Sequence, residues 1–160
     1  MQTINLTDEE KRRFLEEHFY YEVTMLVFCG GKIGEFQRAR DTYSTNMALE
    51  SFLFHARNLR EFFYSETKRP DDARAYEFVK DKSEWDQLKP EETGSIKEVK
   101  RRSGKELAHL TYERFYGTPP GKRWECGEVA TDLLKSVKLF LDHLPGKYMS
   151  DRLRELRRRI

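Results

Sequence analysis

The residues best suited to chemistry in this chain are an arginine and a histidine late in the sequence, Arg102 and His109. Their seven-residue separation is almost two full helical turns, so a continuous helix would place both side chains on one face. A guanidinium can stabilise charge that develops on a phosphate, and an imidazole can move a proton near neutral pH. The pair is therefore a candidate catalytic site for RNA cleavage without a metal.

Two further basic residues, Arg101 and Lys105, lie beside this pair and are candidate phosphate-binding residues. If the helix breaks at Ser103 and Gly104, the free amides of the next helix start would point toward the same anion. The alternative is a structural role. In that case His109 is a partly buried bundle residue bonded to a carboxylate or a carbonyl, and the basic side chains form a solvated face.

A second polar cluster, Ser51, His55 and Asn58, follows helical spacing beside an apolar stripe. These residues could line a cleft facing His109, with His55 as a second acid–base group. Alternatively, they bond across helices and fix the register, because polar groups beside a bundle core need partners. The histidines lack the Glu-x-x-His spacing of helical di-metal sites, so we expect neither a metal nor a cofactor.

In its overall layout and in the spacing of Arg102 and His109, the chain resembles the HEPN superfamily of small helical bundles. The hallmark of that superfamily is an arginine, four to six residues, and then a histidine near the start of a late helix. The resemblance implies that Arg102 and His109 form the catalytic pair of a metal-independent endoribonuclease, built across a homodimer. It equally implies nucleotide binding, or a toxin-like role with a cognate antitoxin-type protein.

The elements that must position these residues are all predicted helices. Thr7 and Glu10 form a capping box, and Gly30 with Gly31 should end the first helix. Residues 66–94 are predicted to be a packed loop holding a short helix, 83–88, capped by Ser83. The other predicted helices span residues 33 or 35–64, 95–116 with a break at 103–104, 127–144, and 147–160, the last being strongly basic. The fold class is therefore all-α, a single domain (1–160) forming a four- to five-helix antiparallel bundle, HEPN-like.

The amino-acid composition limits which kinds of partner the protein can bind. Thirty basic and 28 acidic residues leave a net charge of +2, so any anion site must be local. The longest apolar run is too short to cross a bilayer, and the two cysteines suit a cytoplasmic protein. Aromatic residues left outside the core, such as Tyr20 and Phe54, favour a homodimer. The sequence thus leaves two functions open: RNA cleavage or RNA/nucleotide binding, and a non-catalytic helical protein that binds a partner or a small ligand.

Overall fold

A computed structural model describes residues 6–66, 69, 71–108, 112 and 123–160. Its α-helices are α1 (Asp8–Phe14), α2 (Tyr20–Arg38), α3 (Thr42–Tyr64), α4 (Lys82–Leu88), α5 (Gly94–Arg102), α7 (Cys126–His143) and α8 (Asp151–Arg159). The described residues contain no β-strand, so the predicted all-α fold is confirmed. The helical segments are more numerous than the four or five expected.

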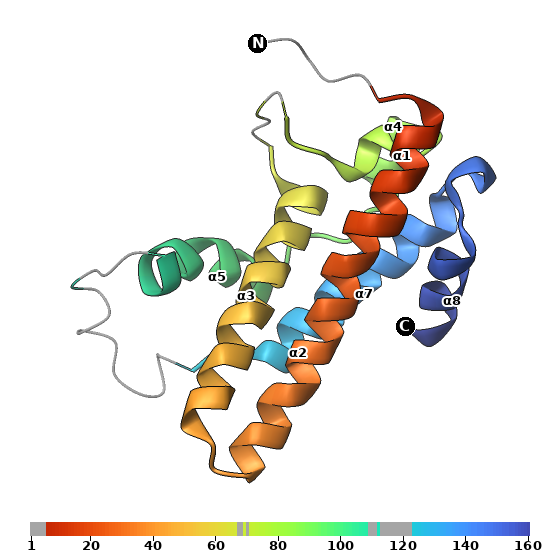
Figure 1. Ribbon diagram of the computed structural model, residues 1–160. Helices are drawn as coiled ribbons and strands as arrows, with labels where there is room; N and C mark the ends of the chain where they lie inside the picture. Colours follow the sequence, from red (N-terminus) through yellow and green to blue (C-terminus); the bar gives the residue numbers. More distant parts are fainter. Residues whose placement is uncertain (1–5, 67–68, 70, 109–111, 113–122) are drawn as a thin grey trace.

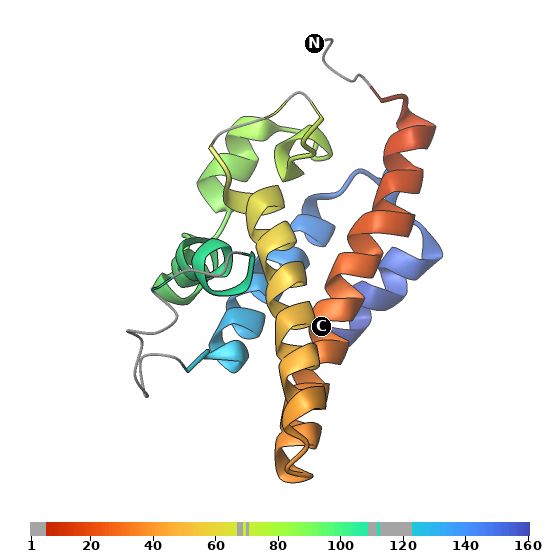
Figure 2. The same ribbon diagram turned by 60° about the vertical axis from the view of Figure 1, so that its left-hand side comes forward.

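The α2–α3 hairpin is the spine of the fold, and the two helices lie side by side in both views (Figures 1 and 2). α1 leads into α2 through a π-helical stretch, Leu15–Phe19. At the tip of the hairpin, Arg40 has a φ of 57°, the left-handed conformation that reverses the chain. Asp41 then caps α3 by accepting a hydrogen bond of 3.0 Å from the Ser44 amide.

The predicted end of the first helix at Gly30 and Gly31 is wrong. α2 continues through both glycines to Arg38, so residues 33–38 belong to this helix and not to the next. No described glycine has a positive φ. A side chain at Gly30 would lie 3.4 Å from the Phe52 ring, so this glycine permits close packing of α2 on α3 rather than a turn.

The remaining helix limits agree more closely with the sequence. The Thr7–Glu10 capping box is present, with the Thr7 amide donating to the Glu10 carboxylate at 2.8 Å. α4 begins one residue earlier than predicted, because Asp81 and not Ser83 is its cap. At the expected interruption the helix changes type instead of stopping: regular α-helix ends at Arg102, and a π-helical stretch, Ser103–Ala108, follows directly.

The core lies where α2, α3, α5 and α7 face one another. Its centre is a group of packed aromatic rings, with centroids 5.0–6.2 Å apart, formed by Phe19, Phe62, Phe63, Trp85 and Phe140. Such pairs stabilise a fold beyond the area that they bury. An apolar stripe of α3 lies in this core, since Phe52, Ala56, Leu59 and Phe63 are all buried.

The last helix closes the bundle. Ser150 caps α8, and Leu153 and Leu156 are buried against the core while the arginines of α8 remain exposed. Just before α8, the Lys147 ammonium and the Tyr148 hydroxyl bond to the two carboxylate oxygens of Asp8 at 2.6 and 2.5 Å. These bonds attach the start of α1 to the C-terminal region.

Among the residues that the structure describes, no helix combines the length and the apolar character needed to span a bilayer.

Candidate functional site

The Arg102 side chain is buried, with only 6% of the residue exposed. Its Nε and Nη2 atoms donate to the Glu106 carboxylate at 2.6 and 2.7 Å, and Nη1 donates to the Arg123 carbonyl at 3.0 Å. The guanidinium also stacks on Trp124, 4.0 Å from the ring centroid. A two-point arginine–carboxylate pair of this kind is strong and geometrically specific. Arg102 therefore fastens α5 to the segment that enters α7.

The other residues of the predicted catalytic cluster are Arg101, Lys105 and His109. Arg101 is exposed and donates to Glu98 in the preceding turn at 2.8 and 2.6 Å, which holds the pKa of Glu98 below its usual value. Lys105 is exposed on the π-helical stretch. His109 lies outside the described residues, so its geometry relative to Arg102 stays a prediction.

The second predicted cluster meets on a residue that the sequence did not single out for chemistry, Glu22 on α2. His55 Nδ1 lies 2.8 Å from Glu22 Oε2, and Asn58 Nδ2 donates to the same oxygen at 3.2 Å. His55 is buried, whereas Asn58 is half-buried. Ser51 is separate from this group and accepts a hydrogen bond from the Cys29 thiol at 3.3 Å. These contacts are cross-helix bonds that set the register of α2 against α3.

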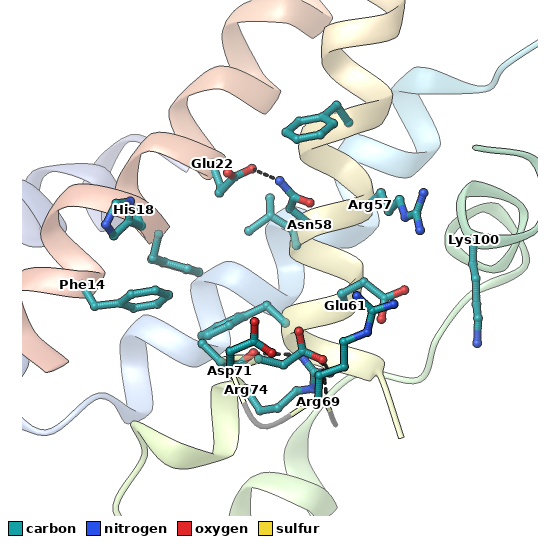
Figure 3. A pocket seen from close by; sticks show the side chains of 16 residues that line it. Phe14, His18, Glu22, Arg57, Asn58, Glu61, Arg69, Asp71, Arg74 and Lys100 are labelled. Atoms are coloured by element: carbon teal, nitrogen blue, oxygen red, sulfur yellow. Dashed lines mark hydrogen bonds and ion pairs between the residues drawn. The ribbon is translucent and has the colours of Figure 1, made fainter. Parts of the chain in front are cut away.

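Asn58 and Glu22 also line the main pocket of the molecule, which has a volume of about 710 Å³. Ligand pockets usually measure about 300–1,000 Å³. Figure 3 shows its walls, which come from α1, α2, α3, α5 and the segment before α4. The remaining lining residues are Phe14, His18, Phe19, Phe54, Arg57, Leu59, Glu61, Phe62, Arg69, Asp71, Asp72, Ala73, Arg74 and Lys100. His55 does not line the pocket itself but contacts the lining residue Glu22, and Ser51 does not line the pocket.

Three of the four lining carboxylates already have partners in the protein. Glu22 binds His55 and Asn58, and Glu61 accepts from Arg60 at 3.0 Å. Asp72 accepts from the Arg69 amide at 2.9 Å and from the Arg74 guanidinium at 2.8 Å. The Arg69 amide, followed by Arg74, lowers the pKa of Asp72, so this carboxylate stays ionised.

Three of the four lining cations, by contrast, have no ion-pair partner among the described residues. They are Arg57 on α3, Arg69 before α4 and Lys100 on α5, and all three are exposed. Figure 3 shows Arg57 and Lys100 on one side of α3, with Asp71 on the other. The pocket therefore has a basic end, at Arg57 and Lys100, that can accept an anion, whereas Arg69 lies beside Asp71 and Arg74.

The sequence did not reveal these three lining cations. Arg57 had a weak signal, because it adjoins the Ser51–His55–Asn58 cluster, and Lys100 lies in the basic run before Arg102. Arg69 had none, since it lies in a segment without periodicity. Among the described residues, no three His, Cys, Asp or Glu side chains are grouped closely enough to hold a metal ion.

Comparisons with protein-family models, with curated proteins and with solved structures found no match to this chain.

Proposed function

We propose that the protein is a non-catalytic helical binding protein, and that its pocket takes a small phosphorylated ligand of nucleotide size. The observation that carries this proposal is that three cations of the pocket lining, Arg57 and Lys100 at the basic end and Arg69 beside Asp71, lack ion-pair partners in the described chain. Three such cations in the lining of one pocket favour an anionic ligand. Guanidinium groups suit phosphate oxygens because they can donate two parallel hydrogen bonds.

The opposite end of the pocket supports a ligand with an aromatic or apolar part. Phe14 lines it with ring surface, and Asn58 and Asp71 offer polar groups that can bind an amine or a hydroxyl. A ring system with a phosphate at one end and exchangeable hydrogens at the other matches this division. Nucleotides have this composition, as do the ends of single-stranded RNA.

The non-catalytic part of the proposal rests on Arg102. Its guanidinium is committed to Glu106, to the Arg123 carbonyl and to the Trp124 ring, so a phosphate would have to displace these contacts. RNA cleavage by Arg102 and His109, a HEPN-like arrangement and an antitoxin-type partner remain predictions from the sequence resemblance.

Isothermal titration calorimetry tests the proposal with AMP, ATP, adenosine and inorganic pyrophosphate as probes. We expect AMP or ATP to bind, adenosine to bind at least about tenfold more weakly, and affinity to fall with salt. The double variant Arg57→Gln/Lys100→Gln should lose about tenfold or more in affinity. Lys97→Gln is the matched control, because Lys97 is exposed on the same helix as Lys100 but does not line the pocket.

Two results would overturn the proposal. One is the absence of binding by any of the phosphorylated probes, or binding that the double variant leaves unchanged. The other is cleavage of an RNA oligonucleotide in the presence of a chelator, abolished by His109→Ala in a variant that still folds, which would show that the protein is an enzyme.

A further inference from the structure

The α2–α3 hairpin projects beyond the rest of the bundle. In both ribbon views its closed end extends past α5, α7 and α8 (Figures 1 and 2). Residues 34–51 form the end of α2, the turn and the first part of α3, and not one of them is buried. Most of the stability of a protein helix comes from packing of an apolar face, so a projecting hairpin of this length needs a surface to pack against.

The hairpin carries the largest exposed apolar side chains of the described protein on one outer face. Tyr21 and Phe28 are seven residues apart on α2, and Met47 and Phe54 are seven apart on α3, so each pair shares one side of its helix. Tyr21 and Phe54 each contact the His55 ring edge-on, with centroids 5.4 and 5.6 Å away. The two sides therefore join across the helix–helix contact into one surface, which we call the hairpin face.

The hairpin face is as large as the largest apolar patches of monomers and supplies more than half of the area that a standard interface buries on one partner. Its members are 51–85% exposed and comprise Tyr21, Phe28, Tyr43, Met47 and Phe54. The four aromatic side chains leave roughly 500 Å² in water, taking about 200 Å² for each whole side chain. Typical monomers have a largest apolar patch of about 300–600 Å², and a standard interface buries about 800 Å² per partner. Met47 and the polar residues Thr24 and Ser51 extend the patch toward that size.

The charges around the face favour an apolar partner over an ionic one. Thr24 and Ser51, which lie between the aromatic residues, are uncharged. Near the tip, Lys32 donates to Glu35 at 2.6 Å, so these charges are satisfied within α2. An uncharged centre rich in Tyr, Phe and Met, with charges at its rim, is the composition of protein–protein interfaces.

We propose that a second copy of this chain covers the hairpin face. The apolar side chains run from the tip, at Tyr43, to the base, at Tyr21 and Phe54, so an antiparallel copy sets each tip against the other copy's base. The same patch is then buried twice, as two-fold symmetry requires, and the four helices form an intermolecular bundle. Residues 34–51 thereby gain the buried contacts that they lack within one chain. α5 and its Arg102 are not part of this face.

Sedimentation equilibrium tests the proposal on the full chain. We expect the wild-type protein to have twice its monomer mass of 19.2 kDa. Phe28→Glu and Met47→Glu place a charge in the centre of the face and should each weaken dimerisation by about 100-fold or more. Leu88→Glu on α4 is the matched control, because Leu88 is an exposed apolar residue far from the face, and its dimer should be unchanged. Circular dichroism checks that each variant keeps its helices.

Hydrogen exchange adds a local readout. Amides of residues 34–51 should exchange more slowly in the dimeric wild type than in Met47→Glu, while those of α7 should not differ. A wild-type protein that sediments as a monomer at every concentration would overturn the proposal. So would a dimer that Phe28→Glu and Met47→Glu leave as tight as Leu88→Glu does. Phe54 belongs to both the hairpin face and the pocket lining, but neither Phe28 nor Met47 lines the pocket, so these two substitutions test the dimer without altering the pocket residues.

Discussion

The guanidinium of Arg102 lies 4.0 Å from the ring centroid of Trp124 and is held there by the Glu106 carboxylate. Arg102 is on α5, whereas Trp124 belongs to the segment that enters α7. One cation thus joins two parts of the chain that are 22 residues apart in sequence. Removing the Arg102 side chain leaves the partly buried Glu106 carboxylate without its ion-pair partner and exposes the face of the Trp124 ring on which the guanidinium stacks.

We predict that Arg102→Ala lowers the free energy of unfolding by about 2–3 kcal/mol, because breaking a buried ion pair strands the remaining charge. Urea denaturation measures this loss. Arg101→Ala is the matched control: Arg101 is an exposed neighbour paired within its own helix, and its loss should cost less than about 0.5 kcal/mol. Full stability in Arg102→Ala would show that the arginine is not a structural anchor.

His55 should also be a structural residue. His55→Ala removes one of the two partners of Glu22 Oε2 and empties a buried position, and we expect a loss of about 2 kcal/mol in urea denaturation. His18 is the control, since it is exposed on the same pocket side of the molecule and contacts only the Phe14 ring. His18→Ala should change stability by less than about 0.5 kcal/mol. Equal effects of the two substitutions would contradict the role assigned to the Glu22–His55 contact.

The thiol of Cys126 should react slowly. Burial raises its pKa to about 11 from the usual 9.0, so little thiolate is present at neutral pH. In a Cys29→Ala background, reaction with a disulfide reagent at pH 8 should be about 100-fold slower than that of a free cysteine. Unfolding in urea should restore the ordinary rate. A fast reaction in the folded protein would mean that the thiol is not desolvated.

Tyr64 should contribute stability that depends on pH. Burial raises its pKa, and its hydroxyl bonds to Ser136 at 2.6 Å. Because the folded pKa lies above the unfolded value, this stability is complete below about pH 10 and is lost as the pH rises through the folded pKa. Tyr64→Phe should therefore cost about 1 kcal/mol at pH 8 and progressively less above pH 10.

Urea denaturation midpoints between about pH 8 and pH 11 measure how the stability difference between wild type and Tyr64→Phe decreases as the pH rises. Tyr112→Phe serves as the control because Tyr112 is 88% exposed, and it should leave the curve unchanged. A constant difference between wild type and Tyr64→Phe across this range would rule out the titration of Tyr64 as its cause.

The local parts of the fold could be predicted from sequence because their signals are local. The Thr7–Glu10 box and the apolar stripe from Phe52 to Phe63 depend on residues three or four positions apart, and both are confirmed. The prediction that the first helix ends at Gly30 was wrong because a glycine can either end a helix or permit close packing. Only the tertiary position of the Phe52 ring shows that Gly30 serves close packing. Helix α2 therefore extends eight residues beyond the predicted end.

The pocket could not be predicted, because its walls meet only in three dimensions. Glu22 joins His55 across 33 residues, and no spacing rule links them. Arg69 and Lys100 enter from segments whose placement depends on tertiary packing. The same limit applies to Arg102: the sequence showed a cation before a late helix, but not that Glu106 and Trp124 would occupy it.

The bonds from Asp8 to Lys147 and Tyr148 span 139 and 140 residues, which has a consequence for biosynthesis. At ordinary rates of translation, α1 leaves the ribosome roughly 10–30 s before its anchor is made. Until then the apolar side of the nascent α1–α2 segment lacks the cover that α7 and α8 will provide. The contacts of Asp8 therefore form only after Lys147 and Tyr148 have been synthesised, and a chaperone has this interval in which to act.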